Sequence, residues 1–143
     1  MQGEKIADTS GRVTLRKVLP NPGGAAKMET VFEAHGKVFG VDETEIGTYW
    51  SVLRPDGTLY GEGQGVVMGK DGEMATWIGQ GVGTLKKDGG VSYRGAIYFQ
   101  SSTPKWSRLN MIQSGALDWR FWNTQMARRG TSSLPPALKW MTR

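Results

Sequence analysis

The chain has 143 residues, of which 38% are hydrophobic and 22% are charged, and this composition is ordinary for one globular domain. It contains no cysteine, which excludes disulfides, thiolate metal sites and cysteine nucleophiles. We interpret residues 1–143 as a single domain in three parts: an irregular lead-in over 1–27, the hairpins of a β-barrel over 28–104, and a basic, Trp-rich C-terminal segment over 105–143.

The net charge of +5 is concentrated in the C-terminal segment. Residues 105–143 hold seven Lys or Arg and one Asp, whereas residues 1–104 carry a net charge of −1. A nucleic-acid-binding surface usually spreads its basic residues over a docking face, so we do not expect nucleic acid as the main partner. The segment does mix aromatic with basic residues, which keeps nucleic-acid association as an alternative: Trp119, Arg120, Phe121, Trp122, Arg128 and Arg129.

Residues 1–20 are polar and lack the apolar core of a signal peptide. No stretch approaches the ~18 consecutive apolar residues that a membrane helix needs. The absence of cysteine also fits a reducing compartment. We therefore expect a cytoplasmic protein with no membrane partner.

The first half of the chain predicts three strands. Within the lead-in, only residues 12–18 have the pattern of a short strand, and Asn-Pro-Gly-Gly at 21–24 is a strong break. Residues 28–38 alternate loosely between apolar and polar side chains. Residues 43–53 are rich in Thr, Tyr, Trp, Ile and Val, which favour strands.

Three hairpin turns follow, at 54–57, 70–72 and 86–90, and each contains Asp-Gly. This dipeptide between alternating runs is a strong hairpin signal. The alternating runs that these turns connect are 58–68, 73–85 and 91–100. The sequence therefore predicts an all-β fold, an antiparallel meander closed into a small barrel without exposed edges.

The C-terminal segment has a different period. Its large apolar residues recur at steps of three and four, which is typical of a helix, although Gly115 weakens that interpretation: Trp106, Leu109, Ile112, Ala116, Trp119, Trp122 and Met126. Three interpretations of this segment stay open: a helix, a strand, or a tail produced by a change of reading frame.

The central strands have one polar and one apolar face. With tight turns, the expected cross-strand pairs are Gln64 with Ile78, Glu62 with Gln80, Gln80 with Ala96, Val82 with Arg94, and Ile78 with Tyr98. The opposite face carries glycine and apolar residues, apart from Glu73 at a strand end. The polar face either meets solvent or lines a cavity inside the barrel, and we adopt the second interpretation because small barrels can hold one ligand.

This interpretation assigns roles to the polar residues. Glu62 is the expected general base, Arg94 offsets the cost of burying that carboxylate, and Tyr98 donates a proton or stabilises an oxyanion. These three are the candidate catalytic residues. The candidate ligand-binding residues, the first two placed near the mouth, are Tyr49, Trp50, Tyr60, Gln64, Gln80 and Gln100.

Other chemistries are excluded or less favoured. His35 is the single histidine, so a multi-His metal site is impossible, and no Gly-x-Ser-x-Gly elbow occurs. The glycines of 61–65 have the wrong spacing for a phosphate-binding loop. Asp42, Glu43 and Glu45 could bind a hard cation, but a solvated acidic loop is the simpler interpretation. We expect no metal and no cofactor.

Residues 27–110 resemble a family of small uncharacterised bacterial proteins. The strings that carry the resemblance are Met-Glu-Thr at 28–30, Gly-Thr-Tyr-Trp-Ser at 47–51, the run at 54–65, Asp-Gly-Glu-Met-Ala-Thr-Trp at 71–77 and Ser-Tyr-Arg-Gly-Ala at 92–96. The glycine-studded hairpins are also similar to allene oxide cyclase-like and calycin-type barrels. That likeness implies ligand binding, or cyclisation or isomerisation of a lipid-like molecule.

After residue 110 the chain departs from this family, whose members continue with an acidic, alternating closing strand. A missing closing strand would leave an open edge, so we expect a homo-oligomer formed through that edge or through Trp119, Phe121 and Trp122.

Three functions follow. The first is a barrel that binds a small hydrophobic molecule with a polar head. The second is a cofactor-independent enzyme, an isomerase or cyclase or a lactone or epoxide hydrolase, that uses a barrel carboxylate. The third is a structural or nucleic-acid-associated protein that uses its basic tail.

Overall fold

The computed structural model describes residues 5–87, 90–111, 115–122 and 125–132, with side chains described up to residue 110. It contains eight strands and one short 3₁₀ helix: β1 Lys5–Val18, β2 Lys27–Val38, β3 Val41–Leu53, β4 Leu59–Gly69, β5 Met74–Leu85, β6 Val91–Gln100, η1 Pro104–Met111, β7 Gly115–Trp122 and β8 Gln125–Ser132.

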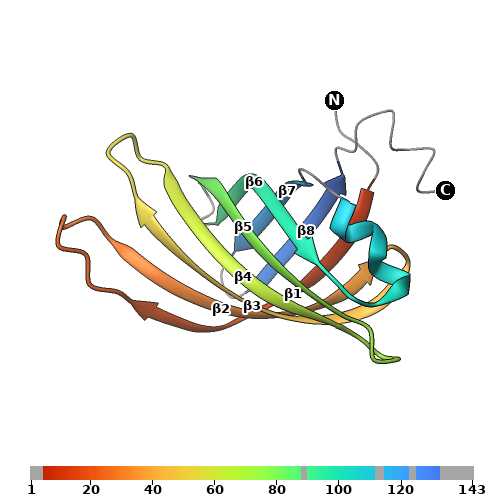
Figure 1. Ribbon diagram of the computed structural model, residues 1–143. Helices are drawn as coiled ribbons and strands as arrows, with labels where there is room; N and C mark the ends of the chain where they lie inside the picture. The colour runs from red at the N-terminus through yellow and green to blue at the C-terminus, as the bar shows by residue number, and fades with distance from the viewer. Residues whose placement is uncertain (1–4, 88–89, 112–114, 123–124, 133–143) are drawn as a thin grey trace.

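Every strand pairs antiparallel with the next strand in the chain, and β8 pairs with β1, so the strand order is that of a closed barrel (Figure 1). The predicted all-β, antiparallel meander is confirmed. In the part of the chain that the structure describes, no helix is long and apolar enough to cross a membrane.

The hairpin turns follow from their sequences. Gly57 and Gly72 have φ of 83° and 88°, a conformation that glycine adopts without steric cost. The two-residue turn between β2 and β3 has φ of 47° at Phe39 and 74° at Gly40, as a type I′ hairpin requires. Phe39 is strained in this conformation, and the Arg108 guanidinium from η1 lies 4.5 Å from the centre of its ring.

One prediction about the ends of the chain is wrong, and one question that the sequence left open has an answer in the structure. The lead-in is not irregular, because β1 spans Lys5–Val18 and pairs with β8 from Lys5 to Arg12 and with β2 from Ala7 to Val18. The C-terminal segment is helical only over η1, and β7 and β8 follow as strands. The sequence Leu-Asp-Trp-Arg-Phe at 117–121 also alternates with a period of two, and pairing with β6 selects that period over the helical one.

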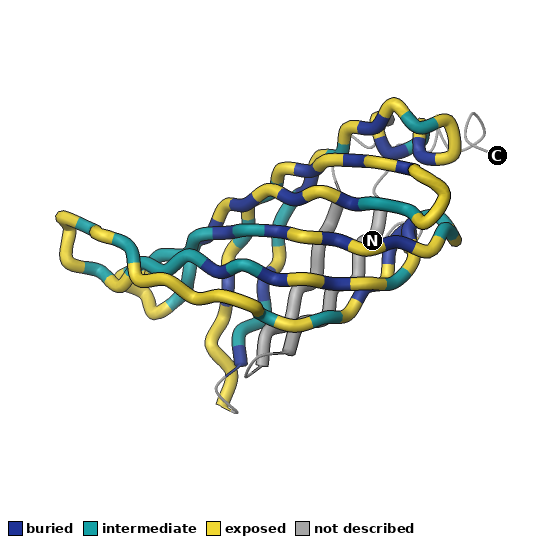
Figure 2. The backbone as a smooth tube through the Cα atoms, turned by 90° about the horizontal axis from the view of Figure 1, so that it is seen from below, coloured by how far each residue is buried: buried dark blue, intermediate teal, exposed yellow. Residues whose placement is uncertain are grey.

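Burial alternates along the central strands, which fixes the inner face of the barrel (Figure 2). Three inward glycines lie directly against aromatic rings of neighbouring strands: Gly47 against Phe32, Gly65 against Trp77, and Gly83 against Tyr93. A Cβ atom at any of these glycines would overlap the ring. The glycines therefore supply the space in which the largest core side chains pack.

We predict that Gly65→Ala destabilises the fold by about 1–3 kcal/mol, because the added methyl group must displace the fully buried Trp77 ring. Urea unfolding followed by tryptophan fluorescence measures the change. The matched control is Gly23→Ala in the β1–β2 loop, where a Cβ meets only the Asn21 Oδ1 atom at 3.6 Å. A Gly65→Ala protein as stable as this control would contradict the packing argument.

Candidate functional site

The predicted register of the central strands is confirmed at every pair that was named, from Gln64 opposite Ile78 to Ile78 opposite Tyr98. The predicted orientation is wrong. The polar side chains are exposed on the outside of the barrel: Glu62, Gln64, Gln80, Arg94, Tyr98 and Gln100. The glycine and apolar face is inside, because only that face can accommodate the large aromatic rings.

Four of the predicted residues meet on this outer surface. The Tyr60 hydroxyl donates to Glu62 Oε1 at 2.7 Å and lies 3.1 Å from Gln80 Oε1. The hydrogen bond to Glu62 raises the pKa of Tyr60. The Trp50 ring lies edge-on to Tyr60, and Lys27 Nζ lies 4.6 Å from the centre of the Trp50 ring. Glu62 is therefore a solvent-facing carboxylate, and the catalytic roles expected for Glu62, Arg94 and Tyr98 lose the interior position on which they depended.

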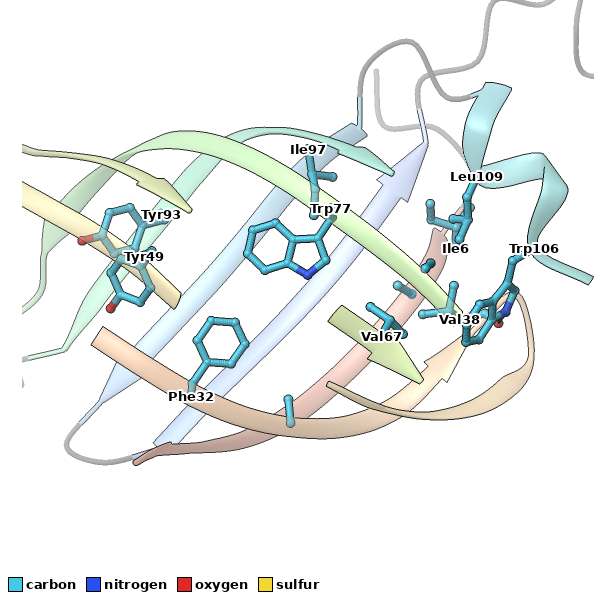
Figure 3. Close-up of a cluster of buried hydrophobic side chains, with 13 residues drawn as sticks. Ile6, Phe32, Val38, Tyr49, Val67, Trp77, Tyr93, Ile97, Trp106 and Leu109 are labelled. Carbon is cyan, nitrogen blue, oxygen red and sulfur yellow. Dashed lines mark hydrogen bonds between the residues drawn. The ribbon is translucent and has the colours of Figure 1, made fainter. Parts of the chain in front are cut away.

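Tyr49 is the one predicted ligand-binding residue that points into the barrel, and it is 7% exposed. Tyr93 packs against it with ring centres 5.8 Å apart and an angle of 70° between the planes. Figure 3 shows these two phenols together at one end of the core, separate from Trp77 in the middle. Tyr93 was overlooked because its strand face was taken as the outer one.

An open cavity of about 340 Å³ lies next to these phenols. The cavity is at the barrel end that carries the β1–β2 and β3–β4 connections, opposite η1 (Figure 1). We call it the mouth cavity. Its apolar wall is formed by Ala26, Met28, Leu53, Leu59, Leu85 and Val91. Its polar groups are Arg16, Thr30, Tyr49, Ser51 and Tyr93.

The hydroxyl groups of the mouth cavity are organised in pairs. Thr30 interacts with the Tyr49 hydroxyl and Ser51 with the Tyr93 hydroxyl, and each interaction lowers the pKa of its phenol. Burial raises the pKa of both phenols, and the proximity of Tyr93 adds to the increase at Tyr49. Both tyrosines are therefore neutral hydrogen-bonding groups at physiological pH.

The other end of the barrel is covered by η1. Trp106 and Leu109 are fully buried, and Trp106 Nε1 donates to the Val38 carbonyl oxygen at 3.2 Å. Figure 3 shows both side chains against Ile6 and Val38 at the end opposite the two phenols. Packing by η1 thus fills this end, while the mouth cavity opens to solvent.

Between the two ends lies a buried carboxylate. Glu45 is 1% exposed and accepts a hydrogen bond of 2.6 Å from Trp77 Nε1. Glu43 is also buried, two residues earlier on the same face of β3. The prediction of a solvated acidic loop is wrong for these two residues because β3 already begins at Val41. It holds for Asp42, which is exposed and bonded to Lys37 Nζ at 2.8 Å.

The residues that the structure describes contain no group of three or more His, Cys, Asp or Glu arranged to hold a metal ion. His35 is exposed on β2. The site therefore consists of hydroxyl groups, one guanidinium and an apolar wall, with the Glu45 carboxylate deeper in the barrel.

No family model and no curated protein matches the chain. Its fold is shared with solved structures. A protein of unknown function from Clostridium acetobutylicum has a TM-score of 0.79 at 12% identity, with 92% of this chain and 99% of that chain covered. A β-barrel-like protein from Acinetobacter baumannii has a TM-score of 0.78 at 12% identity, covering 92% and 94%. An enzyme from Penicillium herquei has a TM-score of 0.61 at 15% identity, covering 92% and 96%.

These matches establish a β-barrel-like fold that this chain shares with proteins of unknown function, bacterial ones among them. At such low identity they describe the fold and carry no activity.

The raised pKa of Tyr49 predicts a loss of stability at high pH. The folded state favours the neutral phenol, whereas the unfolded chain ionises near pH 10. Stability from this group is therefore complete below about pH 10 and falls as the pH rises further. Thermal unfolding between pH 8 and 11.5 should show a steeper decline above pH 10 for the wild type than for Tyr49→Phe. Identical profiles for the two proteins would contradict this account.

Proposed function

We propose that the protein binds a small, largely apolar molecule with a polar head in the mouth cavity. The observation that supports this most is that four hydroxyl groups and the solvent-exposed Arg16 line an otherwise apolar, open cavity at one end of the barrel. Ligand sites are typically apolar concavities with a few polar groups that fix orientation. The mouth cavity has this composition.

The size of the cavity limits the ligand. Pockets for small molecules usually measure about 300–1,000 Å³, and a volume of about 340 Å³ is near the lower limit. A compact molecule, such as one with a bicyclic ring system, matches this space better than a sterol does. The T-shaped Tyr49–Tyr93 pair forms its aromatic inner wall.

We predict that a thermal-shift screen of lactones, epoxides, fatty acids and bicyclic aromatic compounds yields a ligand that raises the melting temperature by several degrees. A ligand at about 100 times its dissociation constant adds roughly 2.7 kcal/mol of stability. Ser51→Trp should abolish that shift because an indole group fills the cavity. Val52→Trp, on the opposite face of the same strand, is the control and should keep it. A shift that survives Ser51→Trp would refute the mouth cavity as the site.

The enzyme hypothesis stays as a second candidate because the barrel does contain a buried carboxylate, Glu45 rather than Glu62. An isomerase, cyclase, or lactone or epoxide hydrolase needs one such acid or base together with a proton donor. If a compound from the screen is converted, Glu45→Gln should reduce its turnover at least a hundredfold. Chromatography of the reaction measures this, and unchanged turnover would exclude Glu45 as the acid or base.

Several expectations from the sequence stay predictions. They are the likeness to allene oxide cyclase-like and calycin barrels, self-association through an edge or the C-terminal segment, nucleic-acid association of the basic tail, and a cytoplasmic location.

A further inference from the structure

We infer that the head group of the ligand is a carboxylate and that Arg16 recognises it. This inference rests on the proposed function, since it names the class of molecule that the mouth cavity binds. It depends on how β1 places Arg16, on the groups around Arg16, and on the charge balance of the cavity wall.

A β-bulge turns Arg16 into the cavity. Val13 pairs with Phe32, but the next pair is Leu15 with Val31, so Thr14 is an extra residue in β1. The Thr14 hydroxyl donates to the Val31 carbonyl oxygen at 3.3 Å. Bulges change the direction in which the following side chains point, and they are common beside binding sites.

The bulge reverses the face on which Arg16 would otherwise lie. Arg12, before the bulge, is exposed and forms an ion pair of 3.8 Å with Glu33 on the outer surface. Residues four apart in a regular strand share a face, so Arg16 would also point outwards without the extra residue. With the bulge, Arg16 pairs instead with the inward-facing Thr30 and lines the mouth cavity, where its side chain stays exposed to solvent at the rim.

The surroundings of Arg16 favour an anion. The described wall of the cavity contains one guanidinium, four hydroxyl groups and no carboxylate. Arg16 is close enough to Tyr49 to act electrostatically on its hydroxyl. Hydroxyl donors and a guanidinium together form the charge-assisted hydrogen bonds that a carboxylate accepts, and the guanidinium can bind both of its oxygens.

The charge balance selects a carboxylate over a phosphate. A phosphate monoester carries a charge of about −1.5 to −2 at pH 7 and three acceptor oxygens, which a single arginine does not neutralise. A carboxylate has one charge, is planar, and matches one guanidinium. The apolar wall then contacts the hydrocarbon part of the same molecule.

The test compares two ligands of nearly equal shape, 2-naphthoate and 2-naphthamide, by isothermal titration calorimetry on the full chain. We expect 2-naphthoate to bind about tenfold or more tightly than the amide, since hydrogen bonds between charged groups are roughly twice as strong as neutral ones. Arg16→Gln should remove most of that difference and leave amide binding within about twofold. Lys17→Gln is the control, because Lys17 follows Arg16 on the opposite face of β1, and neither Lys17 nor its pair, Glu29, lines the cavity.

The outcomes separate the two proposals. Equal binding of both compounds, unaffected by Arg16→Gln, would overturn the carboxylate assignment and leave the proposed function intact. A preference for 2-naphthoate that Lys17→Gln removes as fully as Arg16→Gln would also overturn it, because the effect would then reflect net charge. A third outcome would overturn both the carboxylate assignment and the proposed function. In that outcome neither compound binds, and the Ser51→Trp and wild-type proteins behave identically in the thermal screen. Circular dichroism of each variant confirms that it is folded.

Discussion

The packing of aromatic rings against glycine backbone inside the barrel determines most of this structure. Phe32, Trp77 and Tyr93 each occupy the space that a neighbouring glycine leaves empty. A barrel of eight strands has an interior only wide enough for side chains to fill, so large rings need facing positions without side chains. This constraint places the glycine-rich face inside and leaves Glu62, Gln80 and Arg94 in solvent.

Within this constraint, the chemical character of the buried side chains changes along the barrel axis. At one end η1 inserts the apolar side chains Trp106 and Leu109, which are fully buried. In the middle, the Trp77 indole both fills space and donates to the buried Glu45 carboxylate. At the other end the rings are phenols, Tyr49 and Tyr93, whose hydroxyl groups need polar partners. The mouth cavity is therefore the one described part of the interior that combines access from solvent with convergent hydrogen-bonding groups.

Much of the fold was predictable from local chemistry. Asp-Gly at the turns, and alternation between them, were sufficient to predict the central strands β4, β5 and β6 and their register. The inner face was not predictable in the same way, because a glycine says nothing about the ring that will occupy its space. Arg16 was missed because a bulge at Thr14 has no sequence signal and reverses the face of every later residue in β1. The segment 115–132 stayed open between helix and strand because two periods compete there and only pairing with β6 and β1 decides between them.

The central claim is that the ligand site is the mouth cavity and not the outer polar surface. The most direct measurement is an amide chemical-shift titration of the ¹⁵N-labelled protein with 2-naphthoate. The account predicts that the largest shifts occur at Thr30, Ser51 and Tyr93, which surround the cavity. Shifts centred instead on Gln64, Gln80 and Tyr98, on the outside of the barrel, would contradict it.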